Sequence, residues 1–226
     1  PYDRGLSRLG LSTLVVGWAA CAALAQPDGD IAYLNGPNTR ELTVCVLHLG
    51  SDAVDVIGTG QNDGRPVWDP DGKRLAHTFD QGGVCRIRVV DTKGGNETVL
   101  PSPDGAARDP QWSPDGARIA FVVGASGTER IYVYEIATGV LEPWGGSVVP
   151  LMQPEWISAD RMAAVGRLGT PGSQTTDLFW VSRTRADRID DALPEHGKYL
   201  EWAPASPGIR ELLAYESDDG GDREIY

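Results

Sequence analysis

The sequence predicts an all-β fold made of repeated four-stranded antiparallel units, and three observations support this prediction. A Trp recurs at intervals of 44 to 46 residues, as Trp68, Trp112, Trp156 and Trp202, each time two residues from a Pro. Short apolar runs rich in β-branched and aromatic residues follow each Trp. The 226 residues include 28 glycines and 16 prolines, which suit many short strands joined by tight turns. A fixed period in this range is typical of solenoids, propellers and repeat arrays.

The fullest copy of the repeat begins at Pro110 and predicts four strands. A first strand carries Trp112, and Ser-Pro-Asp-Gly at residues 113–116 forms a turn, because Pro presets φ, Asp bonds its own backbone and Gly accepts positive φ. Strands follow at residues 119–123, 131–134 and 139–142. Four short strands in about 44 residues make one blade of a β-propeller, and such blades must stack to bury both faces.

The other copies follow the same pattern with increasing departures. Residues 66–77 keep the whole turn, residues 154–164 lack its Pro and Gly, and the turn after Trp202 is longer. The residues that define the repeat are expected to be structural, with the Trp side chains packed between blades. They are Trp68, Pro70, Asp71, Gly72, Trp112, Pro114, Asp115, Gly116, Trp156 and Trp202.

The pattern Pro-x-Trp-Ser-Pro-Asp-Gly-x-x-Ile-Ala-Phe at residues 110–121, followed by Ile-Tyr-Val at 131–133, resembles the repeat of the TolB-like β-propellers. The resemblance covers nearly everything after residue 30. It implies a periplasmic protein that binds a partner, as in the envelope Tol–Pal assembly. TolB itself carries an α/β domain before its propeller, whereas only a few residues here precede the first blade. The resemblance is therefore to a TolB-like propeller protein and not to TolB itself.

Residues 1–25 have the composition of a signal peptide. Arg4 and Arg8 precede an apolar run at residues 9–24, and Ala-Leu-Ala at 23–25 forms a cleavage site. The sequence therefore predicts bacterial-type export to the periplasm or the cell exterior. Two alternatives stay open, which are a retained membrane anchor and lipidation at Cys21, although Trp18 stands where lipoprotein signals carry an aliphatic residue.

Residues 26–226 are predicted to form the propeller, about four to five blades of an expected six or seven. The first blade is expected to begin at its second strand, residues 31–34, with further strands at 42–46 and 54–57 and a C-terminal strand beside 31–34. Tyr226 aligns with the middle of a strand, so the propeller is expected to be incomplete at the C-terminus. A complete four-bladed ring is the alternative.

No group of residues in the sequence forms a catalytic motif. His48, His77 and His196 lie at unrelated offsets in different repeats, and no H-E-x-x-H or G-x-S-x-G pattern occurs. His77 takes the place of Phe121, so it is expected to be a hydrogen-bonded core histidine. No catalytic, cofactor-binding or metal-binding residue is therefore assigned.

Calcium binding is a weaker alternative reading of the acidic turns. Each turn supplies one carboxylate, Asp71 or Asp115, which is expected to bond its own backbone, whereas Ca²⁺ needs six or more oxygens. The acidic residues at 218–222 are expected to form a solvated loop. Residues 183–196 are a charged insertion, predicted to be a short helix or an exposed loop.

Cys45 and Cys85 follow the signal segment and lie on strands of successive blades. They can pair in an oxidising compartment, but they are about four positions out of register when the copies are aligned. Two free thiols are favoured over a disulfide.

The formal charge of −12 argues against binding to nucleic acid or to an anionic membrane surface. Membrane contact is expected only through the N-terminal segment. The favoured function is a non-catalytic scaffold that binds a protein or peptide partner. The alternatives are the substrate-gating propeller of a prolyl-oligopeptidase-type serine peptidase, whose catalytic domain would follow, and a TolB-like polysaccharide lyase with metal-binding histidines.

Overall fold

The computed structural model describes residues 29–38, 41–58, 62–93, 95–103, 105–146, 149–170 and 173–189, and the backbone of residues 198–203, 212–217 and 224–225. Within these ranges the chain forms strands joined by turns and loops, and no helix. Residues 1–25, including Cys21, lie outside the described residues, as do His196 and residues 218–222.

The strands form five antiparallel sheets in chain order, here called blades 1 to 5. Blade 1 contains β1 (Asp30–Asn35), β2 (Thr43–His48) and β3 (Ala53–Val56). Blade 2 contains β4 (Val67–Trp68), β5 (Arg74–Gln81), β6 (Val84–Asp91) and β7 (Glu97–Val99). Blade 3 contains β8 (Ala107–Trp112), β9 (Arg118–Val123), β10 (Arg130–Glu135) and β11 (Leu141–Trp144). Blade 4 contains β12 (Leu151–Ser158), β13 (Arg161–Thr170), β14 (Ser173–Val181) and β15 (Ala186–Arg188). Blade 5 contains β16 (Lys198–Ala203), β17 (Leu212–Ser217) and β18 (Glu224–Ile225).

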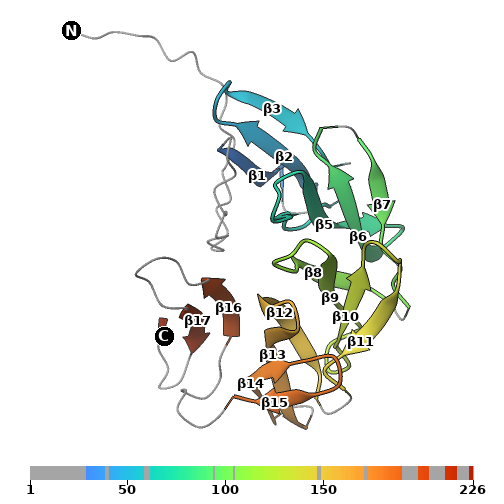
Figure 1. Cartoon of the computed structure of the whole chain (residues 1–226). Helices are drawn as coiled ribbons and strands as arrows, with labels where there is room; N and C mark the ends of the chain where they lie inside the picture. Colours follow the sequence, from blue (N-terminus) through green and yellow to red (C-terminus); the bar gives the residue numbers. More distant parts are fainter. Residues whose placement is uncertain are drawn as a thin grey trace, which may run out of the picture.

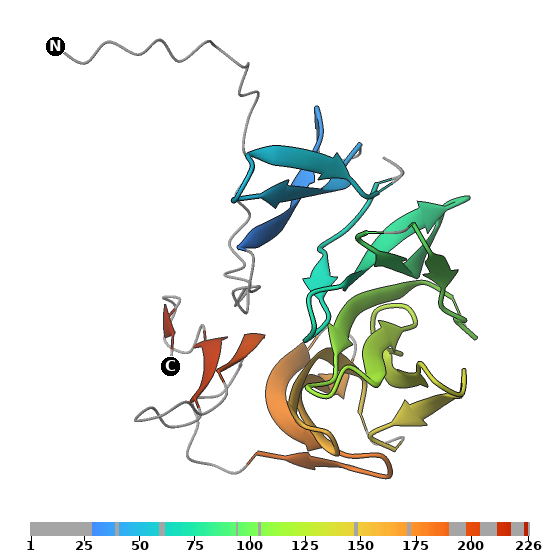
Figure 2. The same cartoon turned by 45° about the horizontal axis from the view of Figure 1, so that its top comes forward.

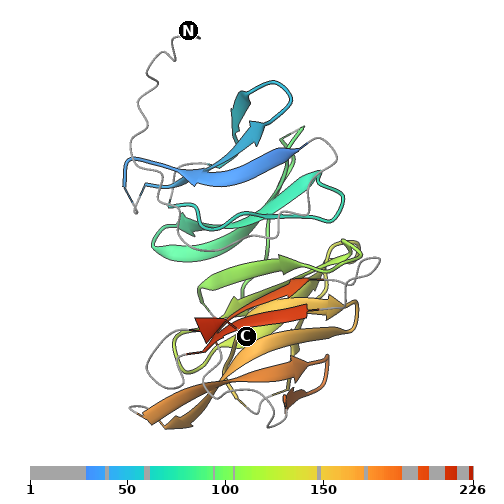
Figure 3. The same ribbon diagram turned by 90° about the vertical axis from the view of Figure 1, so that its left-hand side faces the viewer.

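The blades follow one another along an arc, as the predicted β-propeller requires. Figure 1 shows β8 and β12 on the inner side of the arc and β11 and β15 on its outer side. Figure 2 shows the same succession from another direction, and Figure 3 shows the sheets stacked on one another. Each sheet connects sequential neighbours, so its loops alternate between the two ends of the blade.

This alternation gives the propeller two faces. The turn face carries the turns between first and second strands, residues 69–73, 113–117 and 159–160, and those between third and fourth strands. The loop face carries the loops between second and third strands, such as residues 124–129, and the connections between blades, such as residues 100–103 and 149–150.

Blade 1 begins at its second strand, as the alignment of the copies predicts. β1 pairs with β2 and β2 with β3, and these three strands correspond to β5, β6 and β7 of blade 2. Among the described residues no strand pairs with the other edge of β1, so the C-terminal strand expected there is not among them.

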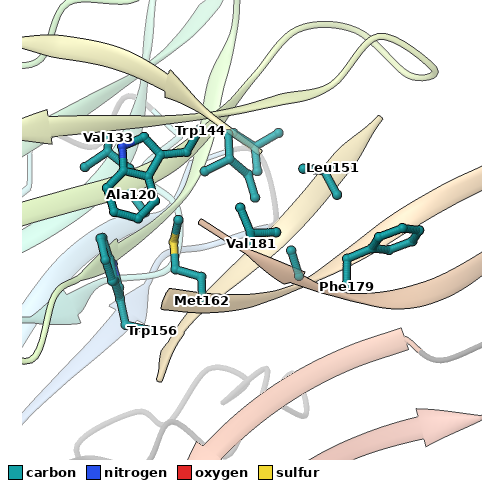
Figure 4. Close-up of a cluster of buried hydrophobic side chains, with 11 residues drawn as sticks. Ala120, Val133, Trp144, Leu151, Trp156, Met162, Phe179 and Val181 are labelled. Carbon is teal, nitrogen blue, oxygen red and sulfur yellow. The ribbon is translucent and has the colours of Figure 1, made fainter. Parts of the chain in front are cut away.

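The core lies between the blades, where the recurring Trp side chains pack. Trp156 is 3% exposed and meets Trp144 of blade 3 edge to face, with ring centroids 5.4 Å apart. Met162, Val181 and neighbouring apolar side chains complete this cluster between blades 3 and 4 (Figure 4). Because such burial removes large apolar areas from water, these interfaces hold the blades together.

An Arg at the start of the second strand ties each of two blades to the next. The Arg74 guanidinium lies 4.5 Å from the Trp112 ring centroid, and its Nη2 donates to the carbonyl oxygen of Gly116 at 3.3 Å. One repeat later, Arg118 lies 5.4 Å from the Trp156 ring and donates to the carbonyl oxygen of Ala159 at 2.6 Å. Each guanidinium therefore stacks on the next blade's Trp and bonds its turn.

The charged insertion after Val181 departs from the prediction. Residues 186–188 form β15, which pairs with β14 and completes blade 4, so this part is neither a helix nor a loop. The pairing supplies backbone hydrogen bonds, which override the unfavourable strand composition of Ala-Asp-Arg.

Candidate functional site

The predicted turn residues occupy the turn face, where they hold the backbone. Gly72 and Gly116 have φ of 68° and 67°, which favours Gly over residues with a Cβ. The Ser113 hydroxyl donates to Asp115 Oδ1 and is the main cause that keeps the pKa of Asp115 below its usual value. The backbone N–H of Ala117, which donates to the same oxygen at 3.1 Å, lowers this pKa further.

In blade 2 the backbone of the turn is held by Asp69, the residue that begins the turn. Asp69 is buried, and its Oδ1 accepts the backbone N–H groups of Lys73 and Arg74 at 2.8 and 3.1 Å. Asp71 is exposed, with its Oδ2 3.5 Å from Lys73 Nζ. Among the described residues no group of three His, Cys, Asp or Glu side chains could hold a metal ion.

The repeat-defining Trp residues lie where the pattern places them, at the ends of first strands. Trp112 and Trp156 are buried, whereas Trp68 is half-buried. Trp202 lies in β16, but its side chain is outside the described part of the chain.

Both cysteines in the described part of the chain are free thiols. Cys45 in β2 is buried, and Cys85 in β6 is half-buried. Burial raises the pKa of the Cys45 thiol, and the nearby carboxylate of Asp63 raises it further.

The two described histidines have opposite surroundings. His77 is fully buried, and its Nδ1 lies 3.0 Å from the carbonyl oxygen of Thr78, which agrees with a hydrogen-bonded core position. His48 is partly exposed, with Nδ1 2.8 Å from Asp30 Oδ2 and Nε2 3.0 Å from Asp55 Oδ2.

A charged cluster on the loop face joins blades 3 and 4. Its centre is Glu129, only 2% exposed, whose Oε1 lies 3.4 Å from Arg108 Nη2 and 3.4 Å from Arg167 Nη2. Glu129 Oε2 accepts the backbone N–H of Gly127 at 2.6 Å. We call Arg108, Glu129 and Arg167 the arginine pair site.

Both guanidinium groups of the arginine pair site are held by further bonds and still reach solvent. Arg108 Nη1 donates to the carbonyl oxygen of Gly124 at 2.8 Å, and Arg167 Nη1 donates to Ser126 Oγ at 2.6 Å. The side chain of Arg108 is 34% exposed and that of Arg167 is 20% exposed. The site is thus a pre-arranged pair of cations at the surface.

The residue three positions before the Trp differs among blades 2, 3 and 4, and that of blade 3, Asp109, lies beside this site. Asp109 and Gln153 have φ of 53° and 50°, within irregularities of β8 and β12 that turn their side chains out of the regular ladder. Arg65 occupies the equivalent position of blade 2 and is exposed. Partial burial raises the pKa of Asp109, whereas Arg108 and Arg65 lower it.

The sequence matches the model of one protein family. The model described as TolB beta propeller domain matches residues 23–170, more than half of the chain. The chain belongs to this family. No curated protein sequence matches it significantly.

Solved structures show the same fold at low sequence identity. A putative TolB from Agrobacterium tumefaciens is 19% identical with a TM-score of 0.58, covering 76% of this chain and 65% of its own. TolB from Acinetobacter baumannii is 20% identical with a TM-score of 0.58, covering 87% and 51%. A prolyl endopeptidase structure is 12% identical with a TM-score of 0.58, covering 89% and 34%. This TolB-type propeller therefore spans about two thirds and about half of the two TolB chains.

The arginine pair site of this TolB-type propeller was not predicted from the sequence. Its residues come from a strand, a loop and a strand of two blades, at offsets that the repeat does not share. One signal was available, since Asp109 and Gln153 both precede a Pro-x-Trp yet differ in charge. In the described part of the chain no helix is long and apolar enough to cross a membrane.

Proposed function

We propose that this TolB-type propeller is an exported, non-catalytic scaffold that binds a protein or peptide partner on its loop face. The observation that carries the proposal is the contrast between neighbouring positions of the repeat. Pro66, Pro110 and Pro154 are the same in three blades, whereas the residues just before them are Arg, Asp and Gln. A rigid frame that presents unlike side chains at equivalent places suits selective recognition.

The export half of the proposal is supported by the predicted signal peptide at residues 1–25. Fusing the whole chain to an alkaline phosphatase that is active only outside the cytoplasm tests it in a bacterial host. We expect phosphatase activity, and we expect deletion of residues 9–24 to abolish it. Equal activity with and without the apolar run would contradict export by this segment.

The binding half is tested by photo-crosslinking in the producing cells. A photoreactive amino acid replaces Gln153 on the loop face or, as the matched control, the exposed Asp160 on the turn face. We expect a discrete crosslinked product from position 153 and none from position 160. Crosslinking from position 160 alone would place the partner on the turn face and contradict the proposed binding to the loop face.

A substrate-gating propeller of a serine peptidase is the second candidate function. It is supported by the similarity to a prolyl endopeptidase structure, whose TM-score equals that of the TolB structures. The gene sequence after the codon for Tyr226 separates the candidates. A G-x-S-x-G motif there favours the peptidase, and a stop codon after further repeats favours the scaffold.

A further inference from the structure

We propose that the arginine pair site takes a carboxylate group of the partner, carried by an acidic peptide segment. This inference rests on the proposed partner-binding function and names the chemistry of one contact. The site would read an Asp or Glu side chain, or a terminal carboxylate, through the guanidinium groups of Arg108 and Arg167.

One buried carboxylate holds the two guanidinium groups of the arginine pair site. Both Nη2 atoms lie 3.4 Å from the same oxygen, Glu129 Oε1, so the two cations converge from different blades. The trio keeps a formal charge of plus one because Glu129 supplies a single negative charge. This excess of one positive charge within the trio attracts a further carboxylate.

The Arg108 guanidinium is accessible from solvent and keeps N–H donors for a ligand. It donates one N–H to the carbonyl oxygen of Gly124 and directs Nη2 toward Glu129, whereas a guanidinium carries five N–H groups. Its Nε lies 3.9 Å from Asp109 Oδ2, beyond the range of a direct hydrogen bond. With a third of the Arg108 side chain exposed, donors remain for a bidentate bond to a carboxylate from solvent.

The arginine pair site is a locally positive region of an acidic molecule. The whole chain has a formal charge of −12, so its overall field repels a generic anion. The loop face of blades 3 and 4 differs locally, because Arg108 and Arg167 flank the single buried carboxylate of Glu129. A partner carboxylate would be attracted at short range only, which favours a specific contact over non-specific binding of polyanions.

Asp109 carries a carboxylate that would compete with a bound peptide carboxylate for Arg108. Its side chain is 46% exposed, and its Oδ2 lies 3.9 Å from Arg108 Nε. A bound peptide carboxylate would meet repulsion from Asp109. Removing that charge should therefore strengthen binding, whereas a purely structural role of the cluster predicts no such gain.

Fluorescence anisotropy with fluorescein-labelled hexaglutamate tests the inference on the whole chain, with hexaglutamine as the neutral probe. We expect binding of hexaglutamate and not of hexaglutamine at low salt, weakening as salt rises. Arg108→Gln and Arg167→Gln should each raise the Kd about tenfold, equivalent to one charge-assisted hydrogen bond. Asp109→Asn should lower the Kd about two- to fivefold, as expected for removal of a nearby like charge.

The matched control is Arg183→Gln on the turn face, which removes the same charge from a 70% exposed side chain. Its Kd should equal that of the wild type. The inference is overturned if hexaglutamate does not bind, if Arg183→Gln weakens binding as much as Arg108→Gln, or if Asp109→Asn leaves it unchanged. If inorganic phosphate and acetate displace hexaglutamate equally well, the site binds anions in general. That result would also overturn the inference.

The two proposals fail separately. Loop-face crosslinking that survives Arg108→Gln leaves the partner-binding function intact and removes only the acidic contact. Hexaglutamate binding without any crosslinked partner would instead remove the partner-binding function in the cells tested. Circular dichroism melting of each variant confirms that the fold is kept, and Asp109→Asn serves where an arginine variant fails to fold.

Discussion

At the residue scale, the two described histidines are a matched pair with opposite pH behaviour. Hydrogen bonds to Asp55 and Asp30 raise the pKa of His48 above its usual value. Burial lowers the pKa of His77, although the Thr78 carbonyl and Asp63 oppose this. The protonated form of His48 is thus favoured by folding, and the neutral form of His77 is favoured by folding.

The pH dependence of stability should separate the two side chains. His48 stabilises the fold fully below its unfolded pKa, and this contribution disappears as pH rises through its higher folded pKa. His48→Gln should therefore lose most stability at acid pH and little at alkaline pH. His77 behaves in the opposite way, because its unfolded form takes up a proton below about pH 6.5 while the folded form stays neutral.

Blade 3 carries Phe at the position of His77. The stability of His77→Phe relative to the wild type should therefore increase as pH falls from 7 to 5. Urea unfolding midpoints of the wild type, His48→Gln and His77→Phe at several pH values measure both trends. Parallel curves for all three proteins would show that neither histidine is linked to folding.

At the element scale, the Arg at the start of a second strand should be a measurable joint between blades. Arg118 contacts Trp156 and Trp144 and bonds the turn carbonyl of Ala159. Arg118→Met keeps the aliphatic stem and removes these contacts, so it should cost about 1–3 kcal/mol of unfolding free energy. For a domain of this size about 2 kcal/mol lowers the Tm by roughly 4–8 °C, which calorimetry detects.

The control for this joint is Arg183→Met, which removes an exposed pair with Glu142. Exposed ion pairs contribute about 0–1 kcal/mol, so its Tm should fall by much less. An equal fall for both variants would mean that the loss comes from charge alone and not from the blade joint.

The blades could be predicted from the sequence because the signals that specify them are local and periodic. Trp112 and Trp156 were expected between blades, and the structure confirms this. Arg74 and Arg118 were missed because an Arg after Asp-Gly resembles a solvated residue of a turn until the neighbouring blade is in place. β15 was missed because its few residues are held by pairing with β14 and not by their own composition.

The arginine pair site was beyond sequence reasoning for a different reason. Arg108, Glu129 and Arg167 are separated by more than a strand each, and no equivalent trio recurs in the repeat. Only the stacking of blade 4 on blade 3 brings them together. Sites of this kind depend on how blades meet, which a repeat pattern does not encode.

At the scale of the whole molecule, blade 1 presents an apolar sheet face like those buried between other blades. Strand pairing places Ile31, Leu47 and Val54 in one row of this face, and Val56 lies in the next. Ile31, Val54 and Val56 are 43%, 48% and 69% exposed, whereas the opposite face packs on Leu75 of blade 2. An exposed apolar face of this kind favours association with another surface.

This face predicts concentration-dependent self-association of the isolated 226-residue chain. Val54→Lys and Val56→Lys add charge to side chains that are already exposed, so they should keep the fold and reduce association. Val140→Lys is the matched control, since Val140 is 51% exposed in the turn between β10 and β11 of blade 3. Light scattering after size-exclusion chromatography measures the mean mass at several concentrations.

Association that persists in Val54→Lys and Val56→Lys, or that Val140→Lys removes equally well, would show that another surface joins the chains. Loss of association in the two blade 1 variants alone would show that this face mediates the association. Stacking of one sheet on another is how the blades bury their apolar side chains, so the exposed face of blade 1 should associate in the same way.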